Sequence, residues 1–113
     1  MSPSTTDVLR HILDELDYLD RASSRVDREG FLTDEDLRRA FVRSLEIVGE
    51  ATKRLPAAVR SSADTVDWRA MAGMRDRLIH GYFAVDYELV WDVVVNEVPE
   101  LHRMVRSLLD RLS

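Results

Sequence analysis

The hydrophobic residues of this chain recur every three to four positions along most of its length, which is the spacing of an amphipathic α-helix. This pattern predicts helices over residues 5–24, from 33 to 55, over 68–80, and from 86 towards the end of the chain. No stretch alternates hydrophobic and polar residues as a half-buried strand does. The predicted fold class is therefore all-α.

The breaks between these helices follow from capping and helix-breaking residues. Gly30 lies in a stretch expected to form a turn or a kinked link, and Thr33 with Asp36 approximates a capping box before the second helix. Pro56 cannot continue a regular helix, so this helix is expected to kink or restart there. Gly81 is expected to end the third helix. The elements predict an up-and-down four-helix bundle with one helix broken by proline.

Gly49 lies inside the second helix, where glycine costs about 1 kcal/mol relative to alanine. A glycine in such a place usually admits a close neighbour, and the third helix is the expected one. Glu46 and Glu50 share one face of the second helix. They are interpreted either as surface partners of nearby basic residues or as an acidic partner for Arg75 or Arg77.

Length and composition are those of one small folded domain. At 113 residues the chain is expected to form a single domain over 1–113, with residues 1–4 as a loose tail. No hydrophobic run approaches the roughly 20 residues that span a bilayer, and the first ten residues lack the features of a signal peptide. The chain has no cysteine and no His/Asp cluster with metal-ligand spacing. We therefore expect a cytoplasmic protein without a metal or another cofactor.

The net charge of −5 argues against a protein that coats nucleic acid, and DNA is not an expected partner. Non-specific affinity for nucleic acid comes from clustered positive charge, which this composition does not supply. An enzyme that holds one RNA strand through a local group of arginines is still compatible with this charge.

Arg75, His80 and Tyr82 lie around the expected end of the third helix. Arg75 falls within the hydrophobic stripe of this helix, and a buried guanidinium requires a carboxylate, a carbonyl or a phosphate as its partner. An imidazole titrates near neutral pH, so His80 is suited to take the 2′-hydroxyl proton of RNA or to protonate the leaving 5′ oxygen. Arg75 is suited to hold the phosphate and to stabilise the charge of the transition state.

A single helix does not bring this arginine and histidine together. Five residues at about 100° each place His80 roughly 140° around the helix from Arg75, whereas Tyr82 returns to nearly the same face. One histidine is also too few to supply a separate base and acid. A two-fold homodimer that joins two copies of the motif answers both difficulties, and unwinding at Gly81 answers the first.

Three residues are expected to support the site, and Tyr82 is the one expected to orient the phosphate. Asp76, one turn before His80, is placed to fix the imidazole tautomer, and Arg77 is expected to help Arg75 attract RNA. The same spacing also fits a purely structural role. In that alternative, the motif residues cap carbonyls at a helix end and bridge to Asp86 or Glu88.

The spacing Arg75-x4-His80-x-Tyr82, the wider string RDRLIHGYFAVDYELVW and the upstream string EIVGEATKRL resemble the HepT-like branch of the HEPN family. The resemblance spans residues 37–101. Members of this family are small all-helical proteins, and many are RNase toxins encoded beside a minimal nucleotidyltransferase antitoxin. The family usually has Asn directly after the motif arginine, where this chain has Asp76.

The resemblance implies a metal-independent RNase toxin of a type II/VII-like toxin–antitoxin pair, which cleaves RNA with Arg75 and His80 in a dimeric site. It also implies that the partner nucleotidyltransferase attaches AMP to the Tyr82 hydroxyl and so blocks the site. Two other functions stay open. One is a catalytically silent helical module that binds nucleotide or substrate for a separate nucleotidyltransferase, and the other is a helical dimerisation protein without a ligand.

Overall fold

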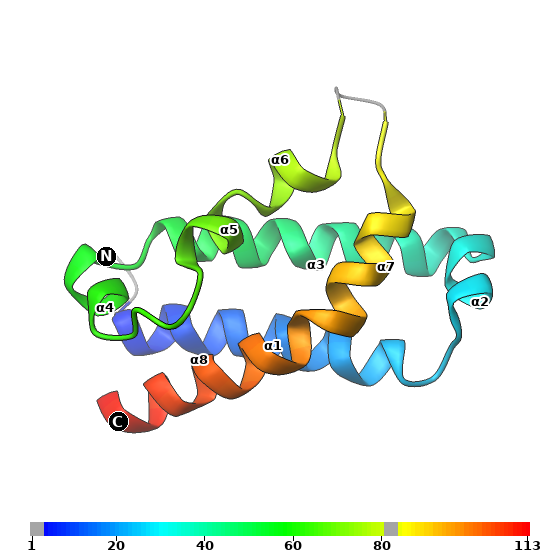
Figure 1. Ribbon diagram of the computed structural model, residues 1–113. Helices are drawn as coiled ribbons and strands as arrows, with labels where there is room; N and C mark the ends of the chain where they lie inside the picture. The colour runs from blue at the N-terminus through cyan, green and yellow to red at the C-terminus, as the bar shows by residue number, and fades with distance from the viewer. Residues whose placement is uncertain (1–3, 81–83) are drawn as a thin grey trace.

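The computed structural model describes residues 4–80 and 84–113, and the described part of the chain is helical apart from its connections and one isolated β-bridge. The longest helices are α1 (Thr5–Ser23), α3 (Glu35–Lys53) and α8 (Val98–Leu112), followed by α7 (Tyr87–Asn96) (Figure 1). The short helices are α2 (Arg28–Thr33), α4 (Ala57–Ser61), α5 (Trp68–Ala72) and α6 (Met74–Leu78). The prediction of an all-α helical bundle is confirmed.

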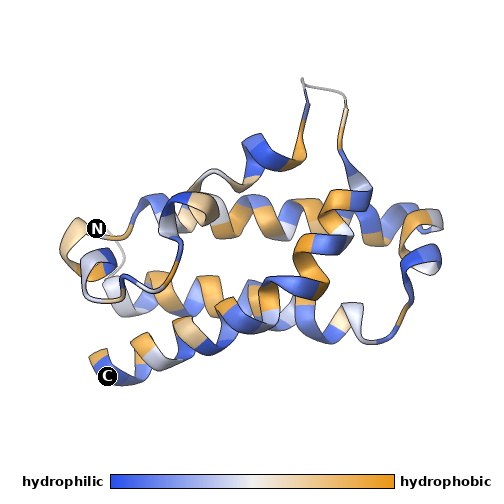
Figure 2. Cartoon of the chain, in the orientation of Figure 1, coloured by the Kyte–Doolittle hydropathy of each residue, from blue (hydrophilic) through white to orange (hydrophobic). Residues whose placement is uncertain are grey.

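Helix α1 lies at the centre of the bundle. It packs along α3 on one side and along α8 on the other, and Figure 1 shows it running opposite to both. Its buried residues are the hydrophobic positions that the spacing predicted. Figure 2 shows hydrophobic and hydrophilic positions alternating along the long helices. Ser4 caps α1 by accepting a hydrogen bond from the Asp7 backbone N–H at 3.2 Å. Residue 4 therefore does not belong to a loose tail, and residues 1–3 lie outside the described residues.

The link between the first two predicted helices is not a turn but the short helix α2, so this prediction is wrong. Asp27 caps α2, and Phe31 is completely buried and stacks on Trp91 of α7 with ring centroids 5.4 Å apart. Thr33 ends α2, and Asp34 is the residue that caps α3. The energy that orders this link comes from burying one aromatic ring against Phe41 of α3 and Trp91 of α7, which is worth about 1.5–3 kcal/mol and is invisible in the local pattern.

Proline marks two helix boundaries, of which the one at Pro56 was predicted. Helix α3 ends at Lys53, and α4 begins directly after Pro56, which occupies its N-cap position. Pro99 lies in the first turn of α8, where its missing N–H leaves no helical hydrogen bond unmade. No helix within the two described ranges is long and hydrophobic enough to cross a membrane.

Helix α5 approaches α3 closely at Gly49, so the predicted close neighbour of this glycine is confirmed. A Cβ atom on Gly49 would lie 3.2 Å from the carbonyl oxygen of Met71 and 3.5 Å from that of Ala72. Both are backbone atoms, which cannot rotate away as a side chain can. A larger residue at position 49 would therefore push α5 away from α3, and with it the segment that leads to the candidate site.

Candidate functional site

The segment predicted to be one helix over residues 68–80 is instead two helices followed by extended backbone. Helices α5 and α6 are separated at Gly73, and α6 ends at Leu78. Ile79 is already extended, with φ of −114° and ψ of 117°. The predicted helix end at Gly81 lies outside the described residues, and the helix stops before reaching it.

The break at Gly73 changes which side of α6 faces the core. Met74 and Leu78 are buried, and α6 packs against α3. Arg75 is exposed, and Figure 2 shows hydrophilic positions on the outward side of α6. The prediction that Arg75 lies in a buried stripe is therefore wrong. That prediction assumed a continuous helix through residue 73. Because the helix breaks there, Met74 and not Arg75 faces the core.

Arg75 keeps its charge available at the surface. None of the described carboxylates lies within 4.0 Å of its guanidinium. An exposed guanidinium without a neutralising acid can hold an incoming anion through two parallel hydrogen bonds, and phosphate fits this geometry.

His80 lies beyond the helix, on one arm of a short antiparallel pair. Its backbone N–H donates to the Ala84 carbonyl oxygen at 2.6 Å, and a β-bridge joins Ile79 to Val85. Figure 1 shows the two arms rising together from the end of α6 and the start of α7. The direction of the His80 side chain is thus set by a β-bridge, and the angular offset calculated for a continuous helix does not apply.

Asp86 is the carboxylate that faces His80. Its Oδ2 lies 4.0 Å from His80 Nε2, while its Oδ1 accepts a hydrogen bond from the Leu89 backbone N–H at 3.0 Å and so caps α7. A separation of 4.0 Å is too long for a hydrogen bond but close enough for electrostatic attraction to an imidazolium. Asp76, expected to support His80, is exposed on α6, and no hydrogen bond or ion pair joins it to His80 among the described contacts. The sequence signal for Asp86 was its place at the start of the last predicted helix, four residues after Tyr82.

Arg77 is committed to a partner that the sequence pattern did not indicate. Its two terminal amino groups donate to the two carboxylate oxygens of Glu97 at 3.1 and 3.0 Å. This pair of hydrogen bonds, together with the Glu97 charge, raises the pKa of Arg77 against the opposing effect of burial. Of the two expected acidic partners, Glu50 binds Lys53 at 3.3 Å, and neither Glu46 nor Glu50 pairs with a motif arginine in the described part. Arg77 thus ties α6 to the junction of α7 and α8.

Tyr82 lies outside the described residues, so its position relative to Arg75 and His80 stays a prediction, as does the homodimer. Within residues 4–80 and 84–113, no three histidine, aspartate or glutamate side chains are grouped so that they could hold a metal ion. The site that can be described consists of an exposed guanidinium on α6, an exposed imidazole on the bridge and a carboxylate at the start of α7.

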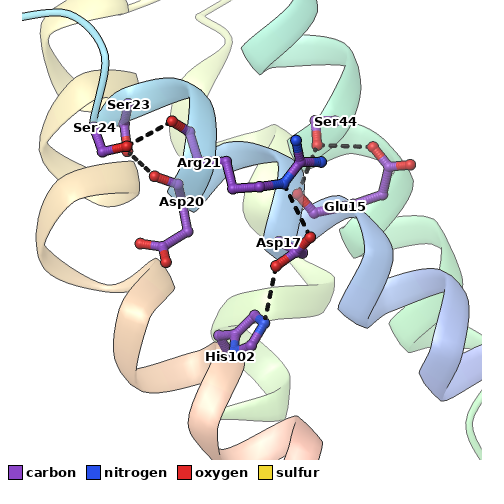
Figure 3. A network of polar contacts seen from close by, with 8 residues as sticks. All are labelled: Glu15, Asp17, Asp20, Arg21, Ser23, Ser24, Ser44 and His102. Atoms are coloured by element: carbon purple, nitrogen blue, oxygen red, sulfur yellow. Dashed lines mark hydrogen bonds and ion pairs between the residues drawn. The ribbon is translucent and has the colours of Figure 1, made fainter.

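A second histidine and aspartate lie close together elsewhere, between α1 and α8. His102 Nε2 is 3.6 Å from Asp17 Oδ1, and Asp17 also accepts a hydrogen bond from Arg21 at 3.1 Å (Figure 3). The same view shows Ser44 of α3 donating to the Glu15 carboxylate of α1 at 2.8 Å. These contacts join the long helices to one another.

The fold and the site define a small all-α protein that carries an arginine, a histidine and an aspartate between the start of α6 and the start of α7. The model of a protein family described as "Ribonuclease HepT-like" matches residues 12–108, which is most of the chain. The chain belongs to this family.

Three curated relatives are similar over nearly their whole length. A "Putative RNase" of Caldanaerobacter subterraneus subsp. tengcongensis is 46% identical over 103 residues, covering 91% of this chain and 92% of the relative. A protein of Methanocaldococcus jannaschii with the same description is 40% identical over 106 residues, covering 90% of this chain and 84% of the relative. A "Probable ribonuclease HepT" of Thermococcus cleftensis is 37% identical over 101 residues, covering 89% of this chain and 92% of the relative. No solved structure matches the chain.

Proposed function

We propose that this protein is a metal-independent endoribonuclease that uses Arg75 and His80. The observation that carries the proposal is the exposed His80 imidazole, whose Nε2 lies 4.0 Å from Asp86 Oδ2, five residues after an exposed Arg75 without a described acidic partner. Family membership and the descriptions of three relatives as ribonucleases support RNA as the substrate.

The reaction that these groups can perform is transfer of the phosphoryl group to the neighbouring ribose hydroxyl. One imidazole takes the 2′-hydroxyl proton while this oxygen attacks the phosphorus, and the bond to the 5′ oxygen breaks. A second imidazole, His80 of the partner subunit, protonates the leaving oxygen. Arg75 holds the phosphate and stabilises its added negative charge in the transition state. The products are a 2′,3′-cyclic phosphate and a 5′-hydroxyl end.

The chemistry of the products tests this mechanism directly. The purified protein is incubated with a 5′-labelled single-stranded RNA in excess EDTA, and the new ends are identified by mass spectrometry. We expect cleavage in EDTA with a cyclic phosphate or 3′-phosphate end. Cleavage that stops on chelation and returns with Mg²⁺ contradicts the mechanism. RNA binding without cleavage favours the catalytically silent binding module instead.

The same proposal requires a homodimer. The arms that carry His80 rise from the bundle (Figure 1), so a two-fold contact at this end would bring two imidazoles to one RNA strand. Light scattering at micromolar concentration is expected to give twice the mass of the chain. A monomer with full ribonuclease activity contradicts the shared site.

The proposal further includes a toxin–antitoxin pair that acts in the cytoplasm, in which a cognate minimal nucleotidyltransferase attaches AMP to Tyr82. The added phosphate would compete with RNA for Arg75 through its negative charge. Intact-mass and peptide spectra of the co-expressed protein are expected to show added AMP on Tyr82, together with loss of cleavage. Tyr82→Phe is expected to escape this modification. An unmodified Tyr82 in a fully inhibited complex would mean inhibition by occlusion.

A further inference from the structure

Arg38 of α3 lies over the aromatic ring of Tyr87, the first residue of α7. Its Cζ atom is 4.9 Å from the ring centroid, and both side chains are half-buried. The Nε atom of Arg38 is buried and has no hydrogen-bond partner in the described part of the chain. Nor does any described carboxylate lie within 4.0 Å of its guanidinium. An aromatic ring therefore positions this charge, and no described acid neutralises it.

Charged residues adjacent to both partners in sequence are already paired. Arg39, the next residue on α3, donates to Glu35 at 2.8 Å. Glu88, the residue after Tyr87, lies 3.4 Å from Arg28. Contact with an aromatic ring occupies only the face of a guanidinium, and its terminal N–H groups stay able to bind an anion in its plane. The arrangement is thus that of a fixed cation with an open binding edge.

This cation adjoins the candidate site. Tyr87 directly follows Asp86, whose carboxylate faces His80 at 4.0 Å. Helix α7 also contacts α3, the helix that carries Arg38. His80, Asp86, Tyr87 and Arg38 therefore form a continuous series of neighbours from the imidazole to the α3 surface. A strand whose scissile phosphate lies at His80 can extend along this series.

We propose that Arg38, held on the ring of Tyr87, binds a backbone phosphate of the RNA strand beside the scissile nucleotide. The proposal rests on the ribonuclease function proposed above and extends it, because it assigns a second phosphate contact outside the motif. Such a contact positions the strand and contributes affinity without reading its sequence. Arg38 therefore acts in substrate binding and takes no part in proton transfer.

The test is RNA binding as a function of salt, in a His80→Ala background that prevents cleavage. With a fluorescent single-stranded RNA, Arg38→Gln is expected to raise Kd about tenfold, the loss expected for one hydrogen-bonded ionic contact. It should also reduce the slope of log K against log salt by about 0.7, because one phosphate contact is lost. Arg39→Gln is the matched control, since it removes the same charge one residue away, and it should change neither quantity. The proposal is overturned if Arg38→Gln in the His80→Ala protein has the same Kd and the same salt slope as the His80→Ala protein alone.

Two further measurements separate the contact from a structural role. Arg38→Lys keeps the charge but not the planar guanidinium, so it should retain the salt slope while losing part of the affinity. In the unsubstituted protein, the ligand is an RNA with 2′-O-methyl riboses, which lacks the attacking hydroxyl and is not cleaved. When bound, it should slow the modification of Arg38 by phenylglyoxal, read by peptide mass spectrometry, but not that of Arg39. This second measurement needs no variant to fold. Unchanged modification of Arg38 in the presence of saturating RNA contradicts the contact.

The outcomes also distinguish this proposal from the ribonuclease proposal. RNA that the His80-intact protein binds through Arg38 but does not cleave would refute the nuclease and leave the Arg38 contact standing. Cleaved RNA whose affinity is unaffected by Arg38→Gln would refute the Arg38 contact alone. If Arg38→Gln weakens only the complex with a co-expressed nucleotidyltransferase, Arg38 belongs to a protein interface and the RNA assignment is overturned.

Discussion

Two histidines of this protein lie near aspartates, and the shorter separation belongs to the one outside the motif. His102 is 3.6 Å from Asp17, whereas His80 is 4.0 Å from Asp86. Distance alone would therefore select the wrong candidate if the motif histidine is catalytic. What differs is access and the other contacts of each carboxylate. The His80 side chain is 66% exposed and the His102 side chain 26% exposed.

The surroundings of the two pairs explain what each can do. Asp17 already accepts a hydrogen bond from Arg21, and His102 lies in a groove of about 360 Å³ that also contains Asp14. The groove also holds Arg10 and Arg106, so its charges are mixed and what limits His102 is access. A general base must come within hydrogen-bond reach of its substrate, which the exposed His80 permits more readily than the half-buried His102. The comparison teaches that a His/Asp pair indicates catalysis only when an anion can reach it.

The largest expected effect separates the two histidines directly. His80→Ala should lower the rate of RNA cleavage by about 10²–10⁴-fold, the usual contribution of a general acid or base. His102→Ala should leave the rate within about twofold, an expectation that follows from the limited access described above. Initial rates on a labelled RNA measure both, and circular dichroism confirms that each variant is folded. A reversed order of the two variants would make the α1–α8 groove the catalytic site.

The arginine associated with each histidine provides the next test. Arg75→Gln should lower kcat/KM by about 10²-fold, as expected for loss of a donor that stabilises transition-state charge. Because Arg75 is exposed, the melting temperature of this variant should equal that of the unsubstituted protein. Arg106→Gln, on the exposed side of α8 in the groove of His102, is the matched control and should leave kcat/KM unchanged. Equal losses in both variants would point to general electrostatic attraction of RNA.

The aspartates are expected to differ less. Asp86→Asn keeps the α7 cap, because an asparagine oxygen can accept the same hydrogen bond, but removes the charge that attracts the His80 imidazolium. Both side chains are largely exposed, so at 4.0 Å this charge is worth about 1 kcal/mol, and cleavage should fall about fivefold. Asp17→Asn should leave the cleavage rate unchanged. A rate for Asp86→Asn equal to that of the unsubstituted protein would show that Asp86 is only a helix cap.

The smallest effect concerns the support of the His80 pair. Arg77→Gln removes the two hydrogen bonds to Glu97, and the partly exposed pair contributes about 1 kcal/mol to folding. The melting temperature should fall by about 4 °C, with little loss of cleavage at temperatures where the variant is folded. Because the pKa of Arg77 is raised in the folded protein, its contribution to stability is complete below its ordinary pKa and is lost only as pH rises through the raised pKa. Thermal unfolding at low and high salt measures the effect, and a large loss of cleavage in the folded variant would instead support substrate binding by Arg77.

The sequence by itself determined the long elements and several of their boundaries. The hydrophobic spacing predicted α1 and its buried face, because a long helix repeats its signal over several turns. Pro56 predicted a restart, residue 86 the start of a helix and Gly49 a close neighbour, because each depends on backbone chemistry local to that residue. The motif also pointed to the family that the comparisons identified.

Only the tertiary structure decided the remaining features, since each depends on residues distant in sequence. Phe31 orders α2 by stacking on Trp91, sixty positions further along the chain. Arg77 donates to Glu97, which lies twenty residues further along the chain at the α7–α8 junction. Helices as short as α5 and α6 carry too few turns for periodicity to reveal the break at Gly73. Arg75 is exposed because of that break, since packing against α3 decides which side of so short a helix is buried. His80 faces Asp86 because of the β-bridge.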